Sequence, residues 1–160
     1  REDSKSLLVH DLTKKNVKKI NIVDAGSGLR QILPIIAATF LNESEDLNND
    51  PQTNKFKTLA LEEPEANLHP KLQVDLANFI SQTVTKLSKT SYIIETHSEH
   101  MMLAFQKLIR EGHLPADYLN VYCVTKDNDG HYTHKMDLDK DGNFLSEWPQ
   151  GFFDERLELI

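Results

Sequence analysis

Two short apolar segments constrain the fold most, because each runs directly into acidic or histidine residues and then into an amphipathic stretch. Residues 58–61 (Thr-Leu-Ala-Leu) lead into Glu62 and Glu63. Residues 92–94 (Tyr-Ile-Ile), which are expected to form a short buried strand, lead into Glu-Thr-His-Ser at 95–98. A strand–helix–strand–helix order with short links predicts a parallel sheet covered by helices. The polar residues then lie at the carboxyl ends of the strands, where open α/β sheets place their ligands.

Each expected strand is followed by an expected helix. Pro70 suits the first position of one helix, and Ser98 is a suitable N-cap for the other. The first helix should bury one face, given by apolar residues at helical spacing: Leu72, Leu76, Phe79, Ile80, Val84 and Leu87. The second helix should end at Gly112, after a stripe formed by Met101, Phe105, Leu108 and Ile109.

Upstream of these units, residues 17–23 are expected to form a strand that leads into a turn of small residues at 24–28. The nearly continuous apolar stretch 29–41 predicts a helix buried on most sides. Pro34 should remove one backbone hydrogen bond of that helix or kink it. The acidic, asparagine-rich stretch 42–54 predicts an exposed loop.

The last third of the chain has a different pattern. Residues 119–125 and 132–138 predict two strands joined by the turn Asp-Asn-Asp-Gly at 127–130. A second turn is expected at 139–142, followed by an aromatic stretch at 148–153. The single cysteine, Cys123, lies in an apolar run and is expected to be a buried thiol.

Composition limits the classes of protein that this chain can represent. Its 160 residues suffice for one core, and no apolar run reaches the roughly 18 residues of a membrane span. The net charge of −7 argues against a broad nucleic-acid surface within this segment, and the basic cluster at 14–19 is expected to be solvated. One cysteine and no signal peptide fit a reducing cytoplasm. The chain opens with Arg1 rather than Met, which suggests a fragment of a longer protein.

The residues at the strand ends suit nucleotide hydrolysis. One carboxylate can help to hold Mg²⁺ through water, and a second can orient or deprotonate the attacking water. Glu62 and Glu63 can share these tasks, because the strand pleat sends adjacent side chains in different directions. A neutral imidazole at His97 can bond a γ-phosphate oxygen or the attacking water.

Three segments together carry a resemblance to a known family. They are Asp-Ala-Gly-Ser-Gly-Leu-Arg-Gln at 24–31, Leu-Glu-Glu-Pro-Glu-Ala-Asn-Leu-His-Pro at 61–70 and Ile-Ile-Glu-Thr-His-Ser-Glu-His at 93–100. They resemble the signature motif, the Walker B segment with its D-loop, and the switch-histidine segment of ABC-class ATPases of the OLD and SMC-like branch. The ending at 148–156 is similar to a C-terminal domain of unknown function, DUF3696. Some ATPases with that ending resemble components of anti-phage systems such as Septu.

The resemblance implies a partial P-loop NTPase fold of ABC type with a β-hairpin-rich extension. Its expected division is a C-terminal ATPase lobe at 17–112 and a DUF3696-like extension at 113–160. It also implies ATP and Mg²⁺ as cofactors, and a homodimer that forms through the ATPase domain. A nuclease partner or DNA would be a further partner, and no membrane is involved.

The resemblance also assigns roles by position. Glu62 stands where most of these proteins have the Walker B aspartate, which implies a role in holding Mg²⁺ through water. Glu63 matches the catalytic glutamate and His97 the switch histidine.

The signature turn, formed by Gly26, Ser27 and Gly28, would contact the nucleotide of the opposite subunit, at a helix start that suits anions. Two positions depart from the family pattern. Gly26 stands at the usual signature serine and Ser27 follows one place later, and His69 replaces the usual D-loop aspartate.

The sequence contains no G-x-x-x-x-G-K-[ST] segment, and Gly26-Ser27-Gly28 lacks the lysine of a phosphate-binding loop. We therefore expect that loop to precede Arg1 in a longer protein. The 160 residues alone are expected neither to bind ATP tightly nor to hydrolyse it.

Other functions remain open at this point. Residues 137–144 fit the first eight places of a calcium loop, but place twelve is Trp148, so a turn between strands is favoured. His131 and His134 make a poor metal pair, because residues three apart on a strand face opposite sides. Zinc at His97 and His100 is disfavoured, because no cysteine or third histidine lies at ligand spacing. A scaffold with a decayed nucleotide site is the alternative of a different class.

Overall fold

A computed structural model gives the chain as two compact units, which are described separately. Unit 1 comprises residues 1–73 and 89–96, and unit 2 comprises residues 74–88 and 97–160. The residues described are 8–10, 19–21, 26–44, 57–86, 90–126 and 128–148, of which 8–10, 19–21 and 44 are described by their backbone alone.

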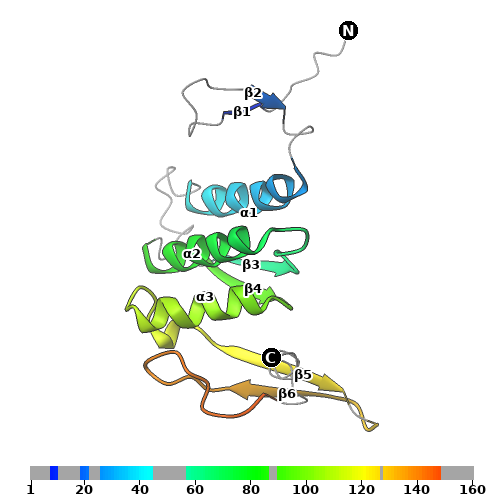
Figure 1. Cartoon of the computed structure of the whole chain (residues 1–160), viewed down its shortest axis with the longest axis vertical. Coiled ribbons are helices and arrows are strands. Elements are labelled where there is room, and N and C mark those ends of the chain that lie inside the picture. The colour runs from blue at the N-terminus through cyan, green and yellow to red at the C-terminus, as the bar shows by residue number, and fades with distance from the viewer. Residues whose placement is uncertain are drawn as a thin grey trace. The chain divides into compact units, whose positions relative to one another are not determined.

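The centre of unit 1 is a parallel strand pair (Figure 1). Strand β3 (Lys57–Glu62) pairs with β4 (Thr90–Glu95) in a register that runs from Lys57↔Thr90 to Glu62↔Glu95. The parallel sheet predicted from the strand–helix order is therefore confirmed. The expectation that β4 is buried is wrong for Ile93, which is 66% exposed. Among the described residues, no element covers the face of the two-stranded sheet on which Ile93 lies.

Helix α1 (Ser27–Ser44) contacts both β3 and β4. The prediction that it is buried on most sides is wrong. Ile35 and Thr39 are buried, whereas Phe40 and Leu41 are 56% and 63% exposed. The strand pair covers one side of the helix, so the apolar residues on its other sides face outward.

The boundaries of α1 also differ in part from expectation. The helix continues through Pro34 without ending, so the lost backbone bond is tolerated. It also includes residues 42–44, which were expected to begin a loop. The remainder of that expected loop, residues 45–54, lies outside the described part of the chain.

A short antiparallel pair precedes α1. Strand β1 (Leu8–His10) pairs with β2 (Lys19–Asn21). The strand predicted at 17–23 is confirmed in its central residues, while its antiparallel partner was not foreseen. The expected turn residues 24 and 25, like 17–18 and 22–23, are outside the described residues.

Among the described residues, most of the buried apolar ones lie in unit 2. Helix α2 (Pro70–Lys86) begins at the predicted proline and buries Leu76 and Ile80, but Leu72 is exposed and Leu87 is not among the described residues. Helix α3 (Glu99–Arg110) buries the whole predicted stripe, which consists of Met101, Phe105, Leu108 and Ile109. Within the described residues, no helix combines the length and apolar character that a membrane crossing requires.

Both ends of α3 follow from local chemistry. The hydroxyl of Ser98 accepts a hydrogen bond of 3.0 Å from the backbone N–H of Met101, which confirms the predicted N-cap. At the other end, Gly112 has a φ of +72°, a conformation that glycine adopts easily after a helix.

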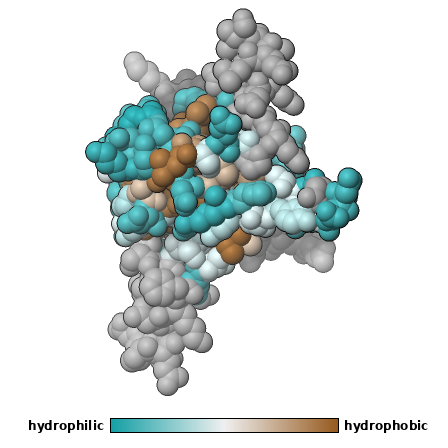
Figure 2. Space-filling view, turned by 90° about the horizontal axis from the view of Figure 1, so that it is seen from below, coloured by the Kyte–Doolittle hydropathy of each residue, from teal (hydrophilic) through white to brown (hydrophobic). Residues whose placement is uncertain are grey.

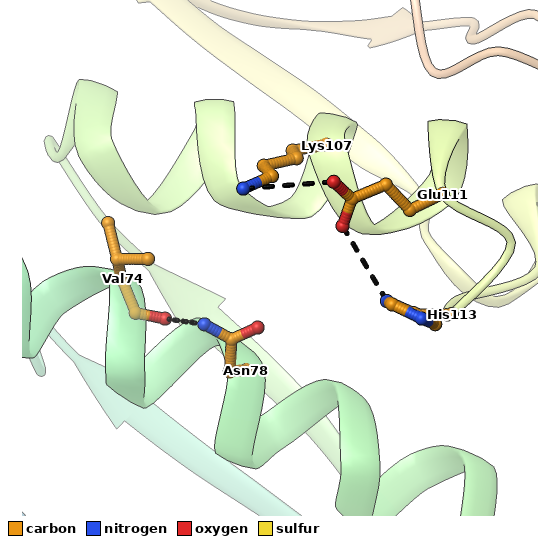
Figure 3. A network of polar contacts seen from close by, with 5 residues as sticks. All are labelled: Val74, Asn78, Lys107, Glu111 and His113. Carbon is orange, nitrogen blue, oxygen red and sulfur yellow. Dashed lines mark hydrogen bonds and ion pairs between the residues drawn. The ribbon is translucent and has the colours of Figure 1, made fainter.

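Figure 3 shows a polar network at the exposed end of α3, where Glu111 lies 3.7 Å from Lys107 and 3.6 Å from His113. The Asn78 amide in the same view donates to the carbonyl of Val74 on α2, at 2.8 Å. An exposed ion pair such as Lys107–Glu111 contributes little to stability.

The single-turn helix η4 (Ala116–Tyr118) leads into an antiparallel hairpin of β5 (Val121–Lys126) and β6 (His131–Met136), as predicted. Cys123 is only half-buried, so the expected buried thiol is wrong. A two-stranded hairpin leaves much of its surface open, and Tyr122 and Val124 are exposed. Figure 2 shows separate apolar groups among hydrophilic residues.

The predicted turn at residues 139–142 is confirmed, since the N–H of Gly142 donates to the Asp139 carbonyl at 3.0 Å. It is attached to α3 by the Gln106 amide, which donates to the Gly142 carbonyl at 2.8 Å. Phe144 and Trp148 follow in an edge-to-face contact with ring centroids 4.8 Å apart. The rest of the aromatic ending, residues 149–156, falls outside the described residues.

Candidate functional site

The carboxyl ends of β3 and β4 bring glutamates together in unit 1. Glu62 and Glu95 are register partners on adjacent strands, and both are exposed. The backbone N–H of Glu63 donates to the carbonyl oxygen of Glu95 at 2.9 Å. Glu62 and Glu63 therefore lie at the carboxyl end of the same strand pair as Glu95, a residue that sequence reasoning had treated only as part of a motif.

Glu63 is held in an unusual backbone conformation. Its φ is +41°, which is uncommon for a residue with a side chain. The explanation expected for the different directions of Glu62 and Glu63, the strand pleat, is therefore wrong. Strand β3 ends at Glu62, and the chain turns at Glu63. Such conformations are costly, and they cluster at functional sites.

The segment after Glu63 forms a compact loop. The N–H of Ala66 donates to the Glu63 carbonyl and that of Leu68 to the Glu65 carbonyl, both at 2.9 Å. Pro64 and Glu65 are buried within this loop. The position of Glu63 is therefore set on one side by β4 and on the other by this folded loop.

His69 caps α2. Its Nδ1 accepts a hydrogen bond of 3.3 Å from the backbone N–H of Lys71. An accepting Nδ1 places the proton of a neutral ring on Nε2. Sequence reasoning missed this cap, although its signal was present: a side chain with an acceptor directly precedes a helix-starting proline.

The expected signature turn lies at the start of α1. Ser27 is the first residue of the helix, and the Gly26 carbonyl accepts from the N–H of Leu29 at 3.1 Å. Gly28 lies close to the loop that follows Glu63, because a Cβ there would be 3.2 Å from Leu68 Cδ2 and 3.4 Å from Leu72 Cδ1. The missing side chain of Gly28 is thus explained by packing, independently of any phosphate.

His97 lies in the link between β4 and α3. It is exposed, it comes two residues after Glu95 in the chain, and it directly precedes the capping residue Ser98. It belongs to unit 2, whereas Glu62 and Glu63 belong to unit 1. The sequence placed His97 at a strand end, and the structure places it just beyond that end.

The chemistry of the donors fits a hard cation. Glu62 and Glu95 present exposed carboxylates, and Mg²⁺ prefers one or two carboxylates together with water and phosphate oxygens. A site made by protein ligands alone is absent, because the described residues hold no group of three or more His, Cys, Asp or Glu able to bind a metal ion.

The chain matches the family described as AAA ATPase domain over residues 3–102, and the family described as Protein of unknown function (DUF3696) over residues 114–160. Endonuclease GajA of Bacillus cereus (strain HuB5-5) is 28% identical over 155 residues, which cover 84% of this chain and 21% of that protein.

The chain thus spans about a fifth of the length of this curated relative. No solved structure matches it. Its mixed α/β fold, with a parallel strand pair, flanking helices and an antiparallel hairpin, is consistent with part of a P-loop ATPase domain. Because the first family match covers more than half of its residues, the chain belongs to the AAA ATPase domain family.

Proposed function

We propose that this chain supplies the hydrolytic half of an ABC-type ATP site in a longer protein, which works as a head-to-tail homodimer. The observation that carries the proposal is the hydrogen bond from the Glu63 N–H to the Glu95 carbonyl. It fixes the backbone of Glu63, which has a φ of +41°, at the carboxyl end of the parallel strand pair. A carboxylate side chain that starts from this point is suited to act on water beside a nucleotide.

The proposed roles follow from chemistry and position. Glu63 orients or deprotonates the attacking water, and Glu62 helps to hold Mg²⁺ through water. His97 bonds the γ-phosphate or the water. When bound, Mg²⁺ neutralises charge on the phosphates.

In the proposed dimer, the turn of Gly26, Ser27 and Gly28 approaches the nucleotide of the partner subunit. Backbone N–H groups at the start of α1 suit the phosphate charge. The Ser27 side chain is exposed, which leaves its hydroxyl accessible to such a ligand.

The phosphate-binding loop is proposed to come from another part of the longer protein, because the 160 residues contain no such motif. The match to about a fifth of a relative's length supports this view. Residues 17–112 would form the C-terminal lobe of the ATPase domain, and residues 113–160 a DUF3696-like extension.

The output of the ATP cycle is proposed to be a DNA-related or phage-defence process in the cytoplasm. The endonuclease named among the relatives supports a link to DNA or to a nuclease partner. The net charge of −7 assigns most DNA contacts to other parts of the assembly.

ATP hydrolysis by the intact protein tests the proposal. Glu63→Gln keeps the size of the side chain and removes the base, so we expect a fall in kcat of about 10²-fold or more. Glu147→Gln, at an exposed glutamate near the end of the described chain, is the matched control and should hydrolyse ATP at the wild-type rate. Equal rates for wild type and Glu63→Gln would favour a scaffold with a decayed site.

A second measurement separates this half-site from a complete one. The 160-residue chain is expected to give no calorimetric signal at micromolar ATP, since it lacks the phosphate-binding loop. Micromolar binding by the chain alone would contradict the proposed division of the site.

A further inference from the structure

Two hydrogen bonds between side chains attach α1 to β4 within unit 1. The hydroxyls of Thr39 and Tyr92 lie 2.8 Å apart, and the Thr90 hydroxyl donates to Glu43 Oε1 at 2.7 Å. All four residues lie away from the ends of α1 and β4 that carry the proposed chemistry. Thr39 follows Ser27 by twelve residues on α1, which is roughly 18 Å along a helix.

The direction of the first bond follows from counting hydroxyl hydrogens. Thr39 is fully buried, and its hydroxyl donates to the carbonyl of Ile35 at 2.8 Å. A threonine hydroxyl has one hydrogen, so Tyr92 donates to Thr39. Removing the Tyr92 hydroxyl therefore breaks one of the two links between helix and strand, while Thr39 keeps the bond that it donates within α1.

The other ends of these two elements reach the proposed site. The carboxyl end of β4 accepts the N–H of Glu63 through the carbonyl of Glu95. The first turn of α1 packs through Gly28 against Leu68, in the loop that begins at Glu63. Thus α1 and β4 are joined at one end by side-chain hydrogen bonds, and at the other end both meet the segment around Glu63.

We infer that Thr39, Tyr92, Glu43 and Thr90 are positioning residues that transmit movement of the signature turn to Glu63. The inference rests on the proposed function. In a head-to-tail dimer, Ser27 would meet the partner's nucleotide, whereas Glu63 would act on the nucleotide of its own subunit. A rigid connection from α1 to β4 therefore links the two ATP sites of the dimer.

The test is the dependence of ATP hydrolysis on ATP concentration in the intact dimer. Tyr92→Phe and Thr90→Val each remove one link, and Thr90→Ser keeps the hydroxyl. Tyr118→Phe and Thr133→Val make the same chemical changes at exposed positions and serve as matched controls. Thermal unfolding of each variant checks that it is folded.

We expect a Hill coefficient above 1 for the wild type, the controls and Thr90→Ser, with a value of about 1 in Tyr92→Phe and Thr90→Val. A purely structural role would reduce the amount of active enzyme and leave the Hill coefficient unchanged. The inference is overturned if the folded variants keep the wild-type coefficient, or if the wild-type coefficient is itself 1.

These outcomes are distinct from failure of the proposed function. That failure would appear as no ATP hydrolysis by the wild type, or as equal hydrolysis by wild type and Glu63→Gln. If the enzyme is active and depends on Glu63 but its two sites act independently, only the inferred coupling is contradicted.

Discussion

The backbone N–H of Glu63 donates a hydrogen bond of 2.9 Å to the carbonyl oxygen of Glu95, which joins the first residue after β3 to the last residue of β4. This bond, together with the positive φ of Glu63, fixes where the chain leaves the sheet. The proposed base therefore has its position set by main-chain geometry, which side-chain substitutions at Glu95 would leave in place.

The strain at Glu63 can be measured by comparing two substitutions. Glu63→Gly and Glu63→Ala both remove the carboxylate, but only glycine accepts a φ of +41° without steric cost. We expect the glycine variant to be more stable than the alanine variant by up to about 1 kcal/mol. Urea unfolding provides the measurement, and equal stability of the two variants would argue against strain. Both variants should lose ATP hydrolysis in the intact protein.

Gly26 and Gly28, the two glycines of the proposed signature turn, should differ in their tolerance of side chains. A Cβ at Gly26 meets nothing within 4 Å, whereas one at Gly28 lies 3.2 Å from Leu68 Cδ2. We expect Gly26→Ala to change the unfolding free energy by less than about 0.5 kcal/mol. Gly28→Val should destabilise by about 1–3 kcal/mol, because it overpacks the contact with Leu68 and Leu72. A Gly28→Val variant as stable as wild type would contradict this packing.

Alanine substitutions at two glycines of positive φ, Gly112 and Gly142, distinguish the cost of the backbone conformation from the cost of a steric clash. Gly112, at φ +72°, has open space around it, so Gly112→Ala should cost about 1 kcal/mol. Gly142, at φ +77°, would place a Cβ only 2.7 Å from the backbone oxygen of Gln106. Gly142→Ala should therefore cost about 2–5 kcal/mol. Thermal or urea unfolding would show whether the second substitution exceeds the first, and similar values would mean that the turn shifts easily away from α3.

The turn that follows β6 should be sensitive to acid. The pKa of Asp139 is lowered from its ordinary value of 3.8, first by the backbone N–H of Asn143, then by the Asn143 side chain and the Asp141 N–H. A lowered folded-state pKa means that the charged carboxylate stabilises the turn above the unfolded pKa. This stabilisation is lost as the pH falls through the folded value.

Amide chemical shifts of Gly142 and Asn143, followed from neutral pH to below about pH 4, would detect this loss. Asp139→Asn should remove the transition, because the amide does not titrate. A wild-type transition at or above the ordinary aspartate pKa would contradict the lowered value.

Several elements were predictable because their causes are local. The apolar runs at 58–61 and 92–94, each bounded by polar residues, predicted β3 and β4. The cap at Ser98 and the turn at 139–142 depend on neighbours within a few residues, so sequence alone could locate them.

Burial was less predictable, because it depends on what lies opposite a residue. The apolar character of α1 suggested a helix covered on most sides, yet Phe40 and Leu41 are exposed. Cys123 and Ile93 differ from expectation for the same reason. Each lies in a two-stranded sheet, which has too few strands and covering elements to bury both faces.

The sequence by itself determined the order of the strands and α-helices from β2 onward. It also placed Glu62, Glu63 and His97 at or just beyond strand ends, because hydrophobic period and local turn chemistry govern both. Only the tertiary structure decided which groups these residues meet. The Glu63 N–H donates a hydrogen bond to a carbonyl on β4, and the Thr39 hydroxyl is hydrogen-bonded to that of Tyr92, 53 residues away. Such contacts arise when the parallel pairing of β3 with β4 and the packing of α1 bring distant segments together, and neither partner's local sequence specifies the other.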